Sequence, residues 1–365
     1  MLNRMMIGSL ITLAMLMACV SDSSAYTFQK TDVSGHPGKL KSGLINLRAH
    51  AGSFPLGDPY RDWLGWVVSE WNKTPAKMVY NLTYDDSSVG ENNGQNEIWF
   101  RSSMSDPAVT KMWYACALAG PCVLYEADVI FNRAEPYIAS AYKPSLWEYG
   151  GSFRPFQTTA MHELGHAQGL GHTADRYSIM GTDWTHIRAN GFLATAYVGE
   201  DAVAGSIALY GADAGLPDYA TAHWRRTGAT AGYSDHSRTR LLASNYVELP
   251  RLSGVEPTYL VNNGQEIEVE VMLESMPPGT VNSFYLALML SSDSNINKND
   301  KLVRLHPITI HSQAWPTAAL FTMVLPTGIP AGSTRYVGVI LDYCDLVTEL
   351  DETNNYTYIA AVRFK

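Results

Sequence analysis

The sequence has no excess of positive charge, since 26 lysines and arginines stand against 35 aspartates and glutamates and leave a net charge of −9. Proteins that bind nucleic acid usually carry a basic stripe, so this balance argues against a nucleic-acid partner. The sequence also has no repeat of fixed period and no low-complexity run. With 46% hydrophobic and 17% charged residues among 365, it predicts globular material of about one to three domains.

The sequence also lacks an apolar run of the roughly 20 residues that a membrane-spanning helix needs. The apolar stretch 7–20 is shorter, follows Arg4, and precedes the small residues Ser23, Ser24 and Ala25. We therefore expect residues 1–25 to be an export signal and the protein to be secreted. Residues 16–19 (LMAC) also resemble a bacterial lipobox, and cleavage there would leave a lipid anchor on Cys19 of an outer-membrane lipoprotein.

Cysteine is scarce, with four in the whole chain. Cys116 and Cys122 enclose a short loop that contains Gly120 and Pro121, and outside the cytoplasm we expect them to form a disulfide. Zinc binding by this pair is the competing interpretation, but no other cysteine or histidine lies at a useful spacing. Cys344 then has no partner, and we expect it to be a buried thiol.

One segment carries most of the chemical information, because residues 162–172 read HELGHAQGLGH and fit the pattern HExxHxxGxxH. His162 and His166 are four residues apart, so a helix places both imidazoles on one face. Gly169 allows the chain to leave the helix sharply, and His172 then returns as a third nitrogen ligand. Three histidines around Zn²⁺ leave a fourth position for water, as in catalytic sites, and Glu163 is the candidate general base.

The first 212 residues predict an α/β or α+β unit. Asp58 and Pro59 are typical of a helix start, and apolar residues at steps of three and four from Tyr60 to Trp71 predict a buried stripe. A helix over about 156–169 carries the histidines, and another over 200–211 begins acidic and ends at glycine. Strand-like runs lie at 45–48, 78–82, 97–101 and 122–131.

The pattern changes near residue 250. Residues 266–271 alternate between polar and apolar, and further strand candidates lie at 283–290, 301–305, 319–325, 335–341 and 356–363. Short strands separated by turn formers predict a β-sandwich over 251–365. The stretch 212–250 has no clear period, and it either packs on the first domain or connects the two; we count it with a first domain over 26–250.

Residues from about 40 to 212 resemble a metzincin zinc peptidase, most closely the matrixin branch. Besides the histidine motif, Met180 lies in a turn that resembles the methionine turn beneath the metal of these enzymes, although ordinary core packing is the alternative for this residue. The resemblance implies a zinc endopeptidase of the α+β class, with a mixed twisted sheet, long helices and a horizontal cleft. A segment within 125–132 resembles the edge strand before the metal helix, which makes Tyr125, Glu126, Ala127, Asp128 and Val129 the expected peptide-binding strand.

The C-terminal residues resemble the CARDB family through Tyr336, Glu349, Asn354 and Asn355 within 336–355. That resemblance implies an immunoglobulin-like sandwich and allows a surface protein or glycan as its ligand. The sequence departs from the matrixins in two respects: it has no PRCGxPD prosegment, and no Tyr-Pro pair follows Met180. Structural calcium is common in this branch, and the candidate ligands are Asp85, Asp86, Glu91, Asn92 and Asn93. The alternative interpretation is that these residues form an ordinary solvated loop.

Together these observations predict a secreted or surface zinc endopeptidase that acts on protein or peptide substrates. Two alternatives stay open. In the first, the chain is a surface-binding or adhesion protein with a vestigial zinc site, which Glu163 argues against because structural zinc has no use for a general base. In the second, the site hydrolyses a non-peptide amide or ester, which the expected long cleft disfavours.

Overall fold

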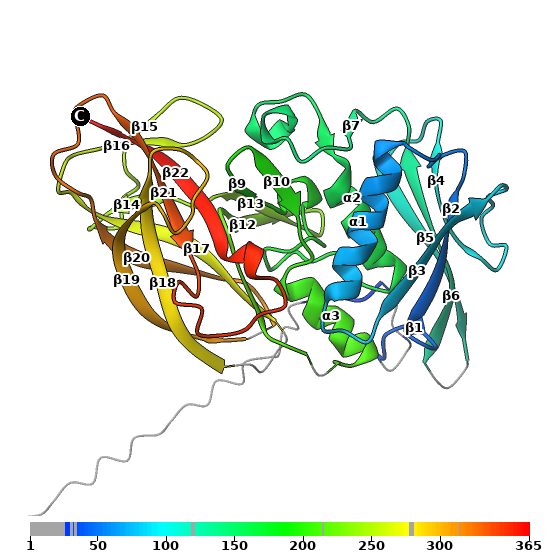
Figure 1. Cartoon of the computed structure of the whole chain (residues 1–365). Coiled ribbons are helices and arrows are strands. Elements are labelled where there is room, and N and C mark those ends of the chain that lie inside the picture. Colours follow the sequence, from blue (N-terminus) through cyan, green and yellow to red (C-terminus); the bar gives the residue numbers. More distant parts are fainter. Residues whose placement is uncertain are drawn as a thin grey trace, which may run out of the picture.

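The computed structural model describes residues 26–29, 32, 35–117, 121–213, 215–276, 281–312 and 314–365. The expected export signal 1–25, with Cys19, lies outside these residues. Among the described residues, no helix is both long and apolar enough to cross a membrane. Figure 1 shows two bodies side by side: one contains a sheet with three helices on the side facing its neighbour, and the other consists of strands.

The sheet of the first body is mixed and six-stranded. β2 runs parallel to β3 and β4, and β4 runs parallel to β6. β5 is antiparallel to β6 and, among the described strands, pairs with no other, so it forms an edge. The expected disulfide Cys116–Cys122 is confirmed and closes the hairpin between β5 and β6. The strands are β1 (Lys39–Leu40), β2 (Leu44–His50), β3 (Val79–Asp86), β4 (Asn96–Arg101), β5 (Ala108–Cys116) and β6 (Cys122–Asn132).

The expected edge strand is therefore wrong. Its residues lie in β6, which has β5 on one side and β1 and β4 on the other. The disulfide hairpin folds residues 108–116 onto the open side of β6, a pairing that the pattern of β6 itself does not reveal. The misassigned residues are Tyr125, Glu126, Ala127, Asp128 and Val129, of which all but Tyr125 are fully buried.

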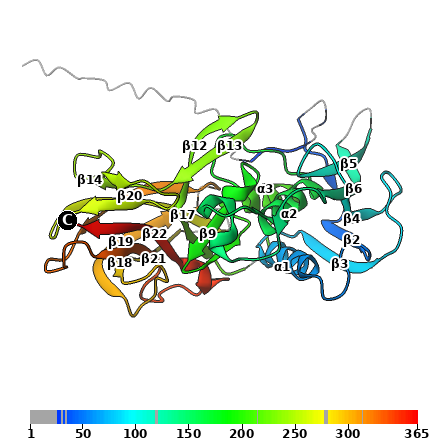
Figure 2. The same cartoon turned by 90° about the horizontal axis from the view of Figure 1, so that it is seen from above.

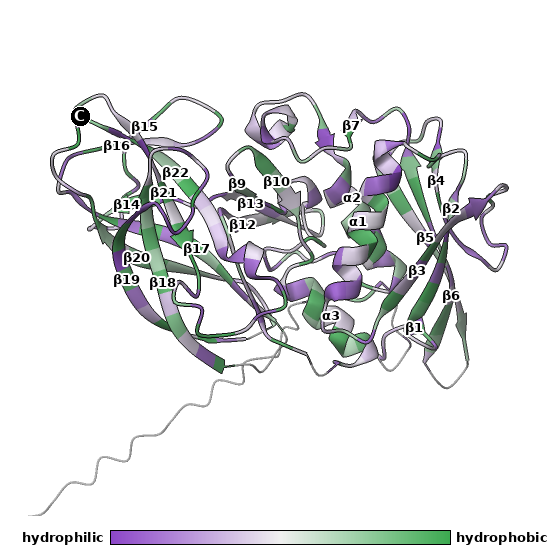
Figure 3. Cartoon of the chain, viewed as in Figure 1, coloured by the Kyte–Doolittle hydropathy of each residue, from purple (hydrophilic) through white to green (hydrophobic). Residues whose placement is uncertain are grey.

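Three helices lie between the sheet and the second body. α1 (Pro59–Lys73) begins as expected, because the Asp58 side chain accepts a hydrogen bond from the Tyr60 backbone N–H at 2.8 Å. The outward face of α1 is coloured hydrophilic to neutral in Figure 3. On the inner side, Trp71 is buried and donates to the Met161 carbonyl of α2 at 3.1 Å. α2 (Phe156–Ala167) is buried along its whole length, and α3 (Glu200–Tyr210) follows after a short two-stranded sheet of β9 (Ile187–Asn190) and β10 (Leu193–Ala196).

The second body consists of two sheets around one apolar core, which agrees with the expected sandwich; its immunoglobulin-like character stays a prediction. One sheet has the order β11-β17-β14, with β20 also pairing with β17, and the other has the order β15-β16-β22-β21-β18-β19. The strands are β11 (Asp218–Ala222), β14 (Leu241–Ala243), β15 (Arg251–Leu252), β16 (Thr258–Val261), β17 (Glu266–Met276), β18 (Val281–Ser291), β19 (Lys301–His311), β20 (Thr317–Val324), β21 (Thr334–Ile340) and β22 (Tyr356–Phe364).

The domain boundary expected near residue 250 lies inside this second body. β11 and β14 both pair with β17, so the sandwich takes its first strand from residue 218 onward. Between them the chain forms the hairpin of β12 (Trp224–Thr230) and β13 (Tyr233–Arg238), which leaves the sheet towards the first body (Figure 2). The stretch 212–250 is thus no separate connector.

The two bodies share buried hydrogen bonds. Glu274 of β17 accepts hydrogen bonds from the Glu200 backbone N–H at 2.7 Å and from the Tyr197 hydroxyl at 2.6 Å. In return, the Glu200 carboxylate accepts from the Ser275 backbone N–H at 2.9 Å. Since breaking such contacts would leave buried polar groups unpaired, the junction holds the two bodies in one arrangement.

Four buried carboxylates lie where the loop 87–95 crosses the first sheet: Asp86, Glu97, Glu126 and Asp128. The Glu97 backbone N–H donates to Asp128 at 3.1 Å, and the Asn93 backbone N–H donates to Glu126 at 2.9 Å. Burial outweighs the hydrogen bond that Asp128 accepts, and with the neighbouring Glu126 and Glu97 charges it raises the pKa of Asp128 to about 8.

We expect Asp128 to make stability depend on pH. In the unfolded chain this carboxyl titrates near 3.8, whereas in the folded chain it keeps its proton up to about pH 8. The free energy of unfolding should therefore fall as the pH rises through this interval. Asp128→Asn should reduce the difference between urea midpoints at pH 5 and pH 8.5. Asp345→Asn, at an exposed carboxylate, is the control, and an unchanged difference in Asp128→Asn would contradict the prediction.

Candidate metal centre and cleft

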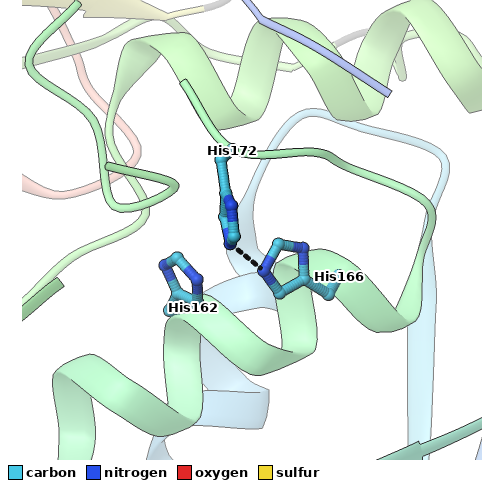
Figure 4. A group of neighbouring side chains, drawn as sticks. All are labelled: His162, His166 and His172. Carbon is cyan, nitrogen blue, oxygen red and sulfur yellow. Dashed lines mark hydrogen bonds between the residues drawn. The ribbon is translucent and has the colours of Figure 1, made fainter. Parts of the chain in front are cut away.

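Three histidines converge at the end of α2. His162 and His166 project from one face of the helix, and the chain turns at Gly169, with φ at +109°, before it brings in His172 (Figure 4). One nitrogen of each ring lies within 4.8 Å of the other two, and the Nε2 atoms of His166 and His172 are 3.0 Å apart. Nitrogen ligands at about 2.05 Å from a tetrahedral Zn²⁺ are about 3.4 Å apart, so the spacing suits such an ion.

Backbone carbonyls fix the tautomer of the two helical histidines. Nδ1 of His162 lies 2.6 Å from the Ile179 carbonyl, and Nδ1 of His166 lies 2.8 Å from the Leu170 carbonyl. A carbonyl oxygen only accepts, so these contacts place the hydrogen on each Nδ1 and leave each Nε2 its lone pair for a metal. The Gln29 side-chain amide also lies 2.9 Å from Nδ1 of His166, and with the hydrogen on Nδ1 the oxygen of this amide must face the ring.

The rings of His166 and His172 also favour the neutral form that metal binding requires. Burial, followed by the charges of the other two histidines, holds the pKa of His166 well below its usual value. The same causes, burial first and then His162, lower the pKa of His172 to about 4. Among the described residues, these three side chains form the one histidine, cysteine or carboxylate group compact enough for an ion, and the donor set fits Zn²⁺.

The expected methionine turn packs against the ligand helix. Met180 is buried, and its sulfur lies so close to Gly165, the residue before His166, that a Cβ there would collide with it. The same turn supplies the Ile179 carbonyl that orients His162, and the Met180 carbonyl accepts from the Thr173 backbone N–H at 2.9 Å. Met180 is thus a core residue placed directly beside the ligand segment.

Glu163 faces the cleft from the same helix. Its Oε2 accepts a hydrogen bond from the Thr110 hydroxyl of β5 at 2.6 Å. Burial raises its pKa, while the charge of His162 and the hydrogen bond from Thr110 act in the opposite direction. The carboxylate is therefore fixed between the metal ligands and the edge strand.

A cavity of about 660 Å³ opens over the three histidines. β5 forms one wall through Ala108, Val109 and Thr110, and the tip of the β12–β13 hairpin lies on the other side with Tyr233. The wall also contains the buried ion pair of Arg154 and Asp183, whose Nη2 and Oδ1 atoms are 2.6 Å apart.

Several of these residues gave no signal in the sequence. Thr110 looks like any strand threonine, and Tyr233 falls in the stretch without a period. Asp183 lies three positions after Met180, and this closeness to the methionine turn is the one sequence signal that could have identified it.

Two expectations about other residues differ from the structure. Cys344 was expected to be buried, which is wrong, because it lies exposed in the loop after β21. The candidate calcium ligands do not converge on one centre: Asp85 is exposed, and Glu91 pairs with Arg101 and Lys111. Among the described residues, Asp86 joins no compact group of histidine, cysteine and carboxylate side chains. Asn92 lies beside the Tyr125 hydroxyl at 3.1 Å and Asn93 donates to Glu97 at 3.0 Å, and calcium binding stays a prediction.

The matrixin family model matches residues 101–211. The match runs from the end of β4 through β5, the three histidines and the methionine turn to the residue after α3. This part of the chain is matrixin-like. The match supports a zinc metallopeptidase kind of function. No curated protein matches the sequence.

Solved structures with some similarity include the CARDB domain of the PF1109 protein from Pyrococcus furiosus. Its crystal structure in complex with di-metal ions is 18% identical, with a TM-score of 0.22 over 29% of this chain and 79% of that one. Its solution NMR structure is 14% identical, with a TM-score of 0.24 over 41% and 97%. A β-glucosidase from Listeria innocua is 14% identical, with a TM-score of 0.21 over 37% and 17%.

We expect the chain to bind about one zinc ion, and His172→Ala to lose most of it after dialysis against a weak chelator. Removing one of three nitrogen ligands leaves two imidazoles that hold the ion poorly. His311→Ala, at an exposed histidine outside the group, should keep the ion. Elemental analysis measures the metal content, and equal zinc in wild type and His172→Ala would refute the ligand assignment.

Proposed function

We propose that this protein is a secreted zinc endopeptidase that cleaves extended segments of protein substrates. The observation that supports it best is the position of Glu163, whose carboxylate lies beside three convergent histidines and is held by the edge strand β5. A site that bound zinc only for structure would have no use for a buried, oriented carboxylate at this place.

The metal would be held by Nε2 of His162, His166 and His172. When bound, Zn²⁺ supplies a Lewis acid that makes a water molecule nucleophilic near neutral pH. Glu163 accepts the proton of the attacking water on its carboxylate and returns it to the leaving amine of the cleaved bond. Thr110 keeps this carboxylate aimed at the cleft through its hydroxyl.

The substrate would bind to β5. An edge strand offers unpaired N–H and C=O groups, and an extended peptide can add to them as one more strand. Ala108, Val109 and Thr110 of this strand line the cavity, so a peptide paired there passes over the histidines. Main-chain pairing favours unfolded or loop segments and depends little on the side chains of the substrate.

Two further points belong to the proposal and rest on sequence. Secretion follows from the expected export signal, with the lipid anchor on Cys19 as the alternative. A ligand of the sandwich, either a surface protein or a glycan, would direct the peptidase to its substrate. Hydrolysis of a non-peptide amide or ester is less favoured, because a free strand edge beside the metal site suits a peptide chain.

Glu163→Ala should lower the rate of casein degradation by about 10²–10⁴-fold or more, because the general base is lost. Zinc content should stay near that of the wild type, since Glu163 is no ligand. The rate is measured with labelled casein and the metal by elemental analysis of the same samples. Glu70→Ala, a glutamate on α1 away from the cleft, serves as the matched control. Equal rates in Glu163→Ala and wild type would remove Glu163 from the mechanism.

A further inference from the structure

One wall of the cleft comes from the second body. β12 and β13 lie in sequence between β11 and β14, which both belong to the sandwich sheet. The hairpin extends from there towards α2, the helix that carries two of the three histidines (Figures 1 and 2). Backbone hydrogen bonds fix it: the Ser234 N–H donates to the Thr173 carbonyl at 2.9 Å, and the Thr182 N–H donates to the Ser234 carbonyl at 3.1 Å. The hairpin is thus held between the loop after His172 and the chain after the methionine turn.

Tyr233 lies at the tip of this hairpin. Ala231 and Gly232 turn the chain with φ values of +49° and +92°, and Tyr233 follows directly. Its ring centroid is 3.9 Å from that of His172 and 6.2 Å from that of His162. The side chain is 36% exposed and lines the cavity, so part of the ring is free to contact a ligand.

The opposite wall begins at Asp106 and continues into β5. Asp106, Ala108 and Tyr233 line the same cavity as the histidines, and α2 lies between β5 and the β12–β13 hairpin (Figure 2). A peptide that pairs with β5 would therefore run between that strand and the ring of Tyr233. An apolar side chain of the peptide next to the scissile bond can pack on this ring, which adds to main-chain pairing.

We propose that Tyr233 is a positioning residue for the substrate, supplied by the C-terminal sandwich, and that its ring selects extended peptides with a bulky apolar side chain beside the cleaved bond. This inference rests on the proposed peptidase function and deepens it. The sandwich then takes part in substrate binding at the catalytic cleft and is more than an accessory domain.

The test measures peptide binding without cleavage. In the full-length Glu163→Ala background, a fluorescent peptide derived from a casein site cut by the wild type is titrated by anisotropy. Adding Tyr233→Ala should raise Kd about 3- to 10-fold for a peptide with leucine flanking the cleavage site. The same peptide with glycine at those positions should show a smaller change. Tyr233→Phe keeps the ring and should restore most of the binding.

Tyr285→Ala, at a tyrosine of β18 with similar exposure of 39%, is the matched control and should leave Kd unchanged. Zinc content is measured in every variant. Unchanged Kd in Tyr233→Ala, equal losses for both peptides, equally weak binding by Tyr233→Phe, or loss of zinc in Tyr233→Ala would each overturn the proposal. The proposed peptidase function is contradicted by a different result, namely that the wild-type protein cleaves no peptide. In that case synthetic casein peptides serve as probes, and their anisotropy titrations still decide whether Tyr233 binds the peptide.

Discussion

The candidate metal centre depends on two hydrogen bonds that the imidazoles of the helix donate to backbone carbonyls. A histidine pair one helical turn apart offers four ring nitrogens, and only those without hydrogen can bind an ion. The Ile179 carbonyl accepts a hydrogen bond from His162, and the Leu170 carbonyl accepts one from His166. Ile179 belongs to the methionine turn, and Leu170 belongs to the loop after α2. The helix, the loop and the turn must therefore all be in place before the ligands point at one centre.

The second body is attached to this same loop and turn. Ser234 of the β12–β13 hairpin pairs with Thr173 on one side and with Thr182 on the other, so the sandwich braces the two segments that flank the methionine turn. Glu274 and Glu200 add a buried junction at the start of α3. Because the hairpin and the junction lie at different places on the first body, rotation of one body against the other would break at least one set of contacts. The cleft is consequently a joint product of both.

Features set by residues close together in the sequence could be predicted, whereas features set by distant residues could not. The convergence of the three histidines, the Asp58 cap and the Cys116–Cys122 disulfide depend on residues close together in the sequence, and these local features were predicted correctly. Zinc binding by the histidines stays a prediction. The edge strand was wrong because strand order depends on a pairing that β6 does not encode. The hairpin at 224–238 was missed because its faces contact another body, which removes the simple alternation of a half-buried strand.

The free edge of β5 gives a separate physical reason to favour a peptide substrate. Exposed strand edges invite pairing with other chains, and proteins usually blunt them with charges, proline, bulges or a covering element. β5 has one charged residue, Lys111, an irregularity in its pairing between Trp113 and Tyr114, and no proline. Both lie beyond Ala108–Thr110, the part that lines the cavity over the histidines, and the described strands leave the outer edge of this part unpaired. Thr110 at this edge holds the carboxylate of Glu163. An open edge at Ala108–Thr110, beside the carboxylate that Thr110 orients, is a place where aggregation could start. Strand addition by a substrate, as proposed above, would give this open edge a function.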